Sequence, residues 1–448
     1  MKNDFRQLLH IEPEKGWLND PNGLCFFNGE YHVYFQYSPD SPYGSGGKCW
    51  GHRAGSFVRM RSDGAVLRPD TPYDKDGVYS GCGFVKDDTL YLFYTGNVKE
   101  EGDHDYIRSG RGANVILVTT KDGHSMSEKK VLLRNSDYPD YCSCHVRDPK
   151  VWEENGRYKM VLGARTLDDK GCVLFYDSDD LYDWKFEKAD SIEDFGYMWE
   201  CPDVFDIGGH RFLSVSPQGL PHEEYRFQNV YSSGHFLYDS SPENYEEWDY
   251  GFDFYAPQTF EAPDGRRILI GWMGIGDIPY TNPTAELGWQ HCLTIPCEVS
   301  ERNGKLIRRP AREFNALKKH PEKIVNIAAG ETLKTELPFY FASFAPKEKF
   351  ALTFEDILEM SYENGVFALW FISNKAGGGR DVRKVRLGSF EAVEIIADRS
   401  SLEIFINGGE KVMSTRFYPD DTMISIHSEE IEGTFYPLDG IEVISDAE

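Results

Sequence analysis

Five stretches of this chain share one pattern, and an internal repeat constrains a fold more strongly than any other sequence feature. They start at Asp20, Ser80, Asp148, Cys201 and Ala256, and each has proline or glycine at its second position. Each continues through a short apolar run, a polar turn such as Asn-Gly or Asp-Gly, and a second run rich in aromatic or β-branched residues. This order is typical of a β-hairpin. The sequence therefore predicts five related hairpins before residue 310.

A second, weaker hairpin pattern follows each of the first five. These patterns begin near Gly51, Gly112, Gly171, Ser233 and Gly288. Two hairpins make a four-stranded sheet, and five such sheets in succession predict a five-bladed β-propeller over residues 1–310. The alternative is a large β-sandwich in which the similarity between hairpins is accidental.

The pattern stops after residue 310. Residues 311–330 are interpreted as a linker with one helical turn. Strand-length apolar runs return in residues 331–448, separated by turn residues that include Asn-Gly-Gly at 407–409, as in a β-sandwich. We therefore expect an all-β chain: a propeller, a linker and a C-terminal β-sandwich with a structural role.

The charge balance excludes some classes of partner. Lys and Arg number 48 and Asp and Glu number 74, so the formal net charge is −26. Such a chain would repel nucleic acid and anionic membrane surfaces, but it can bind a neutral small-molecule sugar. No apolar run approaches the roughly 18 residues of a membrane-spanning helix.

The cysteines indicate free thiols rather than a metal site. None of the nine forms a Cys-X-X-Cys pair. We expect no metal and no cofactor, and a cytoplasmic protein that keeps its thiols reduced. A homo-oligomer is left open.

Three carboxylates stand at or beside the starts of repeats: Asp20, Asp148 and Glu200. In a propeller these positions converge on the central channel. Two carboxylates on either side of a glycosidic bond are the arrangement for glycoside hydrolysis, and aromatic residues nearby suit sugar faces. The alternative is that Asp-Pro begins these hairpins only because it forms turns readily.

The residues around these carboxylates resemble glycoside hydrolase family 32, the β-fructofuranosidases. Residues 17–23, Trp-Leu-Asn-Asp-Pro-Asn-Gly, are similar to the WMNDPNG signature of that family. The other similar motifs follow in the order of the family: 34–37 (YFQY), 50–52 (WGH), 79–81 (YSG), 147–149 (RDP), 200–203 (ECPD), 253–256 (DFYA), 271–273 (GWM), 288–289 (GW), 293–296 (LTIP) and 398–405 (DRSSLEIF).

The resemblance implies a role for each matching residue. Asp20 matches the nucleophile, Glu200 the acid/base and Asp148 the stabiliser of the transition state. The anionic Asp20 and Asp148 should raise the pKa of Glu200 and keep it protonated for its acid step. The residues expected to bind the substrate are Asn19, Gln36, Tyr43, Trp50, Tyr79, Ser80, Arg147, Tyr255 and Trp289.

Three positions depart from the pattern of the family. Tyr43 stands where the family often has tryptophan, Cys82 changes the residues beside Ser80, and Cys297 follows the LTIP motif where arginine is usual.

The expected activity is retaining hydrolysis of terminal non-reducing β-fructofuranosyl units from sucrose, sucrose 6-phosphate or short fructo-oligosaccharides. The alternatives are an exo-hydrolase of inulin or levan, a propeller glycosidase acting on another furanoside such as arabinan, and a non-catalytic carbohydrate-binding propeller. A binding propeller should lack Asp20 or Glu200, and both are present.

Overall fold

The computed structural model describes residues 3–328, 330–344, 349–428 and 430–445. Within these ranges the regular structure is almost entirely β-strand, which confirms the all-β prediction. The exceptions are a short helix, α1 (Asn374–Gly377), and the 3-10 turns η1 (Asn135–Asp137), η2 (Pro283–Leu287) and η3 (Arg312–Leu317). None of the helices in the described part of the chain has the length and apolar character needed to cross a membrane. The cytoplasmic location stays a prediction.

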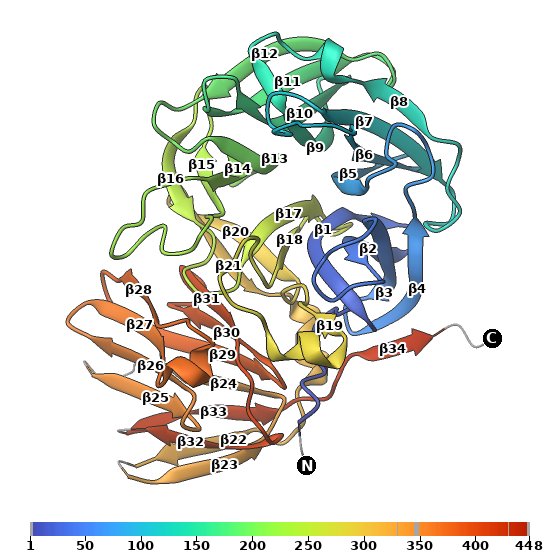
Figure 1. Cartoon of the computed structure of the whole chain (residues 1–448). Helices are drawn as coiled ribbons and strands as arrows, with labels where there is room; N and C mark the ends of the chain where they lie inside the picture. The colour runs from blue at the N-terminus through green and yellow to red at the C-terminus, as the bar shows by residue number, and fades with distance from the viewer. Residues whose placement is uncertain (1–2, 329, 345–348, 429, 446–448) are drawn as a thin grey trace.

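In the described residues, five sheets follow one another along the chain; each contains four antiparallel strands, and the first has two further strands. The five predicted first hairpins are the first two strands of each sheet (Figure 1). The first two sheets contain β1 (Gly16–Phe27), β2 (Glu30–Ser38), β3 (Cys49–Ser56), β4 (Arg59–Leu67), β5 (Val78–Lys86), β6 (Thr89–Lys99), β7 (Arg111–Thr120) and β8 (Lys130–Leu133). The third and fourth contain β9 (Cys142–Glu154), β10 (Arg157–Thr166), β11 (Gly171–Ser178), β12 (Lys185–Ser191), β13 (Met198–Ile207), β14 (His210–Gln218), β15 (Gly234–Leu237) and β16 (Glu243–Glu247). The fifth contains β17 (Tyr255–Glu261), β18 (Arg267–Trp272), β20 (Cys297–Arg302) and β21 (Lys305–Pro310).

The first strands of the five sheets contact one another in a closed cycle. β1 contacts β5, β5 contacts β9, β9 contacts β13, β13 contacts β17, and β17 returns to β1. The sheets therefore lie around a common centre that their first strands surround (Figure 1).

The first sheet gains two strands from distant parts of the chain. β19 (Trp289–Gln290) pairs in parallel with β1, and β34 (Glu442–Ser445) pairs in parallel with β4. The sequence pattern began the last hairpin at Gly288, but in the structure that hairpin is β20 and β21 and starts at Cys297. Residues 289–296 lie outside it because Leu293 N–H donates to the Ile11 carbonyl, and because Pro296 has no N–H for a strand ladder.

Two six-stranded sheets make up the C-terminal part. One contains β22 (Lys323–Ile327), β33 (Ile431–Pro437), β24 (Phe339–Phe344), β29 (Ala392–Asp398), β30 (Ser401–Ile406) and β31 (Lys411–Arg416). The other contains β23 (Thr332–Glu336), β32 (Met423–Ser428), β25 (Phe350–Phe354), β26 (Leu358–Glu363), β27 (Val366–Phe371) and β28 (Val382–Arg386). Their apolar side chains, among them Phe339, Leu369 and Ile404, form one buried cluster. Residues 311–330, expected as a linker, contain η3 and the strand β22.

Buried charged groups join the C-terminal sheets to the ring. Arg380 pairs with Asp253 at 2.8 Å, just before β17. Asp249 pairs with Arg308 at 2.7 Å and also accepts a hydrogen bond from Ser414 N–H of β31. These contacts fix the segment that leads into β17, and with it the position of Tyr255.

Candidate active site

The pairing of every first strand with the second strand of its sheet is interrupted, near the start of four of the first strands and midway along β9. The interruptions fall within residues 18–21, 78–81, 147–150, 200–203 and 255–258. Asp148, Cys201 and Ala256 have positive φ angles of 60°, 48° and 49°. Bulges turn side chains away from the regular pleat, and strained backbone gathers at functional sites. Each sheet thus presents polar side chains to the centre of the ring.

These side chains line a cavity of about 230 Å³. It contains nine of the predicted site residues: Asn19, Asp20, Gln36, Tyr79, Ser80, Arg147, Asp148, Glu200 and Tyr255. The three carboxylates therefore share one cavity although they come from three different sheets.

Three predicted substrate-binding residues do not line this cavity. Tyr43 is 62% exposed on a loop. Trp50 is fully buried and donates from Nε1 to the Tyr79 carbonyl at 3.1 Å, so it supports a residue of the lining. Trp289 is buried beneath the Arg6 guanidinium, 4.3 Å from its ring centre. Their predicted contacts with substrate have no support in this geometry.

Asp20 is held from both sides. Its Oδ1 accepts a hydrogen bond from Asn19 Nδ2 at 3.1 Å, and its Oδ2 accepts one from the Ser80 hydroxyl. The Asn19 amide is itself fixed, because Trp17 Nε1 and Lys48 Nζ both donate to its Oδ1 at 3.0 Å. The carboxylate is therefore oriented before any ligand enters.

Asp148 is bound through backbone groups. Its N–H donates to Thr95 Oγ1 at 2.8 Å, and its Oδ2 accepts from Cys201 N–H at 2.9 Å. Burial, together with the charges of Glu200 and Asp20 and against the opposing charge of Arg147, raises the pKa of Asp148 to about 7.

Glu200 accepts two hydrogen bonds on Oε2, from the Tyr255 hydroxyl at 2.7 Å and from Gln218 Nε2 at 2.9 Å. Burial raises the pKa of Glu200, and the charge of Asp20 raises it further. Arg147, whose Nε lies 3.7 Å from Oε1, lowers it. The pKa of Glu200 is raised, as expected, but burial contributes more than the charge of Asp20, and Asp148 is not among the main causes.

Some residues that line the cavity were not predicted from the sequence. Lys48 lies two residues before the Trp-Gly-His motif, and Trp272 lies inside the Gly-Trp-Met motif, so both could have been found. Gln218, Tyr231 and Asp277 also line the cavity and carry no comparable signal. Across the described residues, no group of three or more His, Cys, Asp or Glu side chains could hold a metal ion.

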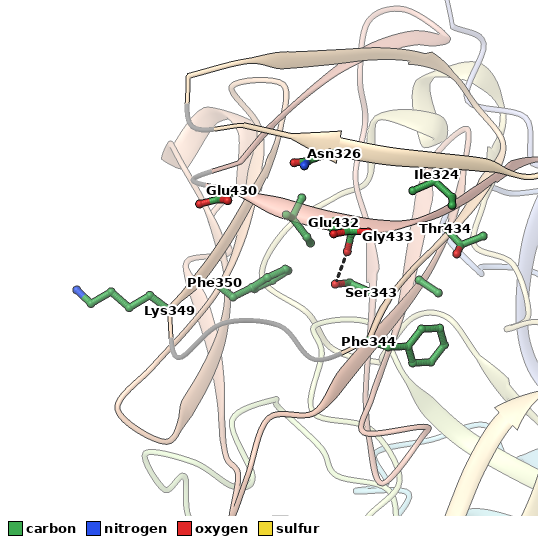
Figure 2. Close-up of a pocket in the computed structure, with 12 residues that line it drawn as sticks. Ile324, Asn326, Ser343, Phe344, Lys349, Phe350, Glu430, Glu432, Gly433 and Thr434 are labelled. Atoms are coloured by element: carbon green, nitrogen blue, oxygen red, sulfur yellow. Dashed lines mark hydrogen bonds between the residues drawn. The ribbon is translucent and has the colours of Figure 1, made fainter.

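A larger cavity of about 400 Å³ lies on the C-terminal sheets, against β22, β24 and β33 (Figure 2). Ile324, Phe344 and Phe350 contribute to its wall, and Ser343 Oγ donates to the Glu432 carbonyl at 2.7 Å. None of the predicted site residues lies there. The chemistry indicated by the sequence is therefore confined to the smaller cavity.

Comparison with known proteins places these features in one family. The family model described as Glycosyl hydrolases family 32 N-terminal domain matches residues 10–310, and the model described as Glycosyl hydrolases family 32 C terminal matches residues 379–443.

Individual proteins agree with the family models. A sucrose-6-phosphate hydrolase of Bacillus subtilis is 38% identical over 92% of this chain and 89% of its own length. A raffinose invertase of Escherichia coli is 36% identical over 95% and 92% of the two chains. The structure of a Bombyx mori GH32 beta-fructofuranosidase superposes with a TM-score of 0.86 at 27% identity, covering 98% of this chain and 95% of that one. The chain belongs to glycosyl hydrolase family 32.

Proposed function

We propose that this chain is a retaining β-fructofuranosidase. It removes terminal non-reducing fructose from sucrose, sucrose 6-phosphate or short fructo-oligosaccharides. The observation that carries the proposal is the convergence of Asp20, Asp148 and Glu200 on one cavity. The five sheets are interpreted as a five-bladed β-propeller over residues 1–310, with a linker at 311–330 and a β-sandwich over 331–448.

In the first step, an oxygen of Asp20 attacks the anomeric carbon of the fructosyl unit. Glu200 gives its proton to the glycosidic oxygen as the bond breaks, and the leaving sugar departs as an alcohol. The hydrogen bonds from Asn19 and Ser80 hold the attacking carboxylate in place. The product of this step is a fructosyl ester of Asp20.

In the second step, the Glu200 carboxylate takes a proton from water, and the water oxygen attacks the anomeric carbon. Asp20 leaves as a carboxylate, and two inversions give retention of configuration. This route requires the two carboxyl groups to lie about 5–5.5 Å apart. In this proposal Asp148, Gln36, Arg147 and Tyr79, which line the same cavity, hold the hydroxyl groups of the fructose.

The size of the cavity favours a short substrate. Its volume of about 230 Å³ is below the roughly 300–1,000 Å³ typical of sites for larger ligands. The relatives named for sucrose 6-phosphate and raffinose support a small sugar as substrate. Exo-hydrolysis of inulin or levan and cleavage of another furanoside are the alternatives.

A panel of sugars tests the proposal. Sucrose, sucrose 6-phosphate, kestose, raffinose, inulin and an arabinan are incubated with the protein and with its Glu200→Gln variant. Fructose should appear from the small fructosides, with turnover falling steeply towards inulin, and the variant should be at least about 100-fold slower on sucrose. Release of arabinose without fructose, or no release from any substrate, would overturn the proposal.

A further inference from the structure

We propose that Lys48 is a positioning residue for Asp20: its ammonium charge, acting through the Asn19 amide, stabilises Asp20 as it leaves the fructosyl ester in the second step. The inference rests on the proposed function and deepens it by assigning a residue to one of the two steps. Lys48 lines the cavity and lies outside the motifs that resemble the family.

The Asn19 amide connects Lys48 to Asp20. Lys48 Nζ donates to Asn19 Oδ1 at 3.0 Å, and Asn19 Nδ2 donates to Asp20 Oδ1 at 3.1 Å. The ammonium at Oδ1 identifies that end of the amide as the oxygen, because an ammonium group only donates. Hydrogen bonds in series polarise one another, so a cation at Oδ1 strengthens the donation from Nδ2 to the carboxylate.

The orientation of this amide does not depend on Lys48 alone. Trp17 Nε1 also donates to Asn19 Oδ1 at 3.0 Å, and Asn19 Nδ2 donates to Gln36 Oε1 as well. Both ends of the amide therefore keep a partner when Lys48 is replaced. What Lys48 adds to this set of hydrogen bonds is a positive charge.

Lys48 and Arg147 are the two Lys or Arg side chains that line the cavity within the described ranges. Arg147 Nε lies 3.7 Å from Glu200 Oε1, and its charge also lowers the pKa of Asp148. Lys48 acts on the other carboxylate. Burial lowers the pKa of Lys48 to about 8, although the charge of Asp20 acts in the opposite direction. The ammonium therefore carries its charge at neutral pH.

This charge favours the second step over the first. In the first step Asp20 loses negative charge as it attacks, so a nearby cation stabilises the free carboxylate more than the transition state. In the second step negative charge develops on Asp20 as its bond to the anomeric carbon breaks, and a fixed cation stabilises that transition state. Lys48 should therefore speed the breakdown of the fructosyl-enzyme.

The test uses a fructoside whose leaving group needs no protonation, so that the second step limits kcat. Lys48→Gln can still donate to Asn19 but has no charge, and its kcat should fall about tenfold. KM should fall with kcat because the fructosyl-enzyme accumulates, so kcat/KM should not fall. Lys48→Arg keeps the charge and should restore most of kcat. Lys121→Gln is the control and should match the unmodified protein, because Lys121 is exposed and pairs with Asp88 at 2.7 Å.

The pH dependence of kcat on this substrate gives a second readout. Activity should fall as the pH rises, with a midpoint no higher than about 8, because Lys48 loses its proton and esterified Asp20 no longer helps to hold it. Glu200 acts as a base in the second step, so its ionisation cannot cause this loss. Burial raises the pKa of Cys49 to about 11 and lowers that of His291 well below its ordinary value, so neither changes charge near pH 8. Lys48→Arg should move the loss to higher pH.

Three results would overturn the proposal while leaving the hydrolase intact. They are an unchanged kcat in Lys48→Gln, a fall in its kcat/KM as large as the fall in kcat, and a kcat in Lys48→Arg as low as in Lys48→Gln. The second of these would indicate a purely structural role, since a slower second step alone leaves kcat/KM unchanged. Absence of fructose release by the unmodified protein would instead refute the proposed function.

Discussion

The protonation of Glu200 depends on opposing influences within one cavity. Burial and the charge of Asp20 raise its pKa, whereas Arg147 and the hydrogen bonds from Tyr255 and Gln218 lower it. The carboxyl groups interact, so their titrations belong to the group rather than to single residues. In the proposed mechanism, this balance allows Glu200 to donate a proton in the first step and to accept one in the second.

Removing the hydroxyl of Tyr255 should shift this balance. Tyr255→Phe deletes a hydrogen bond of 2.7 Å that favours the Glu200 carboxylate, so the pKa of Glu200 should rise. The alkaline limb of kcat/KM against pH reports loss of the proton, and it should move up by about one unit. Tyr231→Phe is the control, since Tyr231 lines the same cavity but bonds Asp277. An alkaline limb that stays in place or moves down in Tyr255→Phe would contradict this account.

At the scale of single elements, the bulges in the first strands of the five sheets position the side chains of the candidate active site. The hairpins were predictable because proline, turn residues and apolar runs recur locally in the sequence. The bulges were not predictable, because the residues with positive φ are Asp148, Cys201 and Ala256 rather than glycines. Their conformation is set by neighbouring strands, which a local pattern does not record.

Gly163 shows how closely two sheets approach behind the site. It lies on β10 opposite Arg147, and a Cβ there would lie 1.9 Å from the carbonyl oxygen of Trp199, the residue before Glu200. Gly163→Ala should therefore cost at least about 2 kcal/mol of stability and reduce kcat by displacing Glu200. Gly388→Ala is the matched control, because nothing lies within 4 Å of its added Cβ. Thermal unfolding of both variants checks this, and equal stability would show that the sheets can separate at no cost.

At the scale of the whole molecule, the chain ends tie its two parts together. His10 is buried between Asp398 Oδ2 at 2.8 Å and Glu403 Oε1 at 3.0 Å, both in the C-terminal sheets. The short strands β19 and β34 complete the first sheet. Sequence patterns predict the two groups of sheets, but a two-residue strand has no periodicity to detect, and His10 has no partner nearby in sequence. For that reason these contacts could not be predicted from the sequence.

The His10 cluster should make stability depend on pH. Burial lowers the pKa of His10, but the hydrogen bonds and charges of Asp398 and Glu403 outweigh this and raise it to about 9, from 6.5 for the ordinary side chain. The stabilisation is complete below pH 6.5 and is lost as pH rises to about 9, because only the folded state holds the proton in that window. The free energy of unfolding should fall by roughly 1.4 kcal/mol per pH unit there. Urea unfolding of the protein and of His10→Gln measures the free energy of unfolding at each pH. Parallel pH dependences of the two proteins would show that His10 is not the group responsible.

The central claim is the division of roles between Asp20 and Glu200, and azide rescue tests it most directly. Glu200→Ala and Asp20→Ala are each given a fructoside whose leaving group needs no protonation, with azide present, and the configuration of the product is determined. Glu200→Ala still has its nucleophile, so it should form the fructosyl-enzyme and release a β-fructosyl azide. Asp20→Ala has no attacking carboxylate and should form none. A β-fructosyl azide from Asp20→Ala and none from Glu200→Ala would show that the two roles are exchanged.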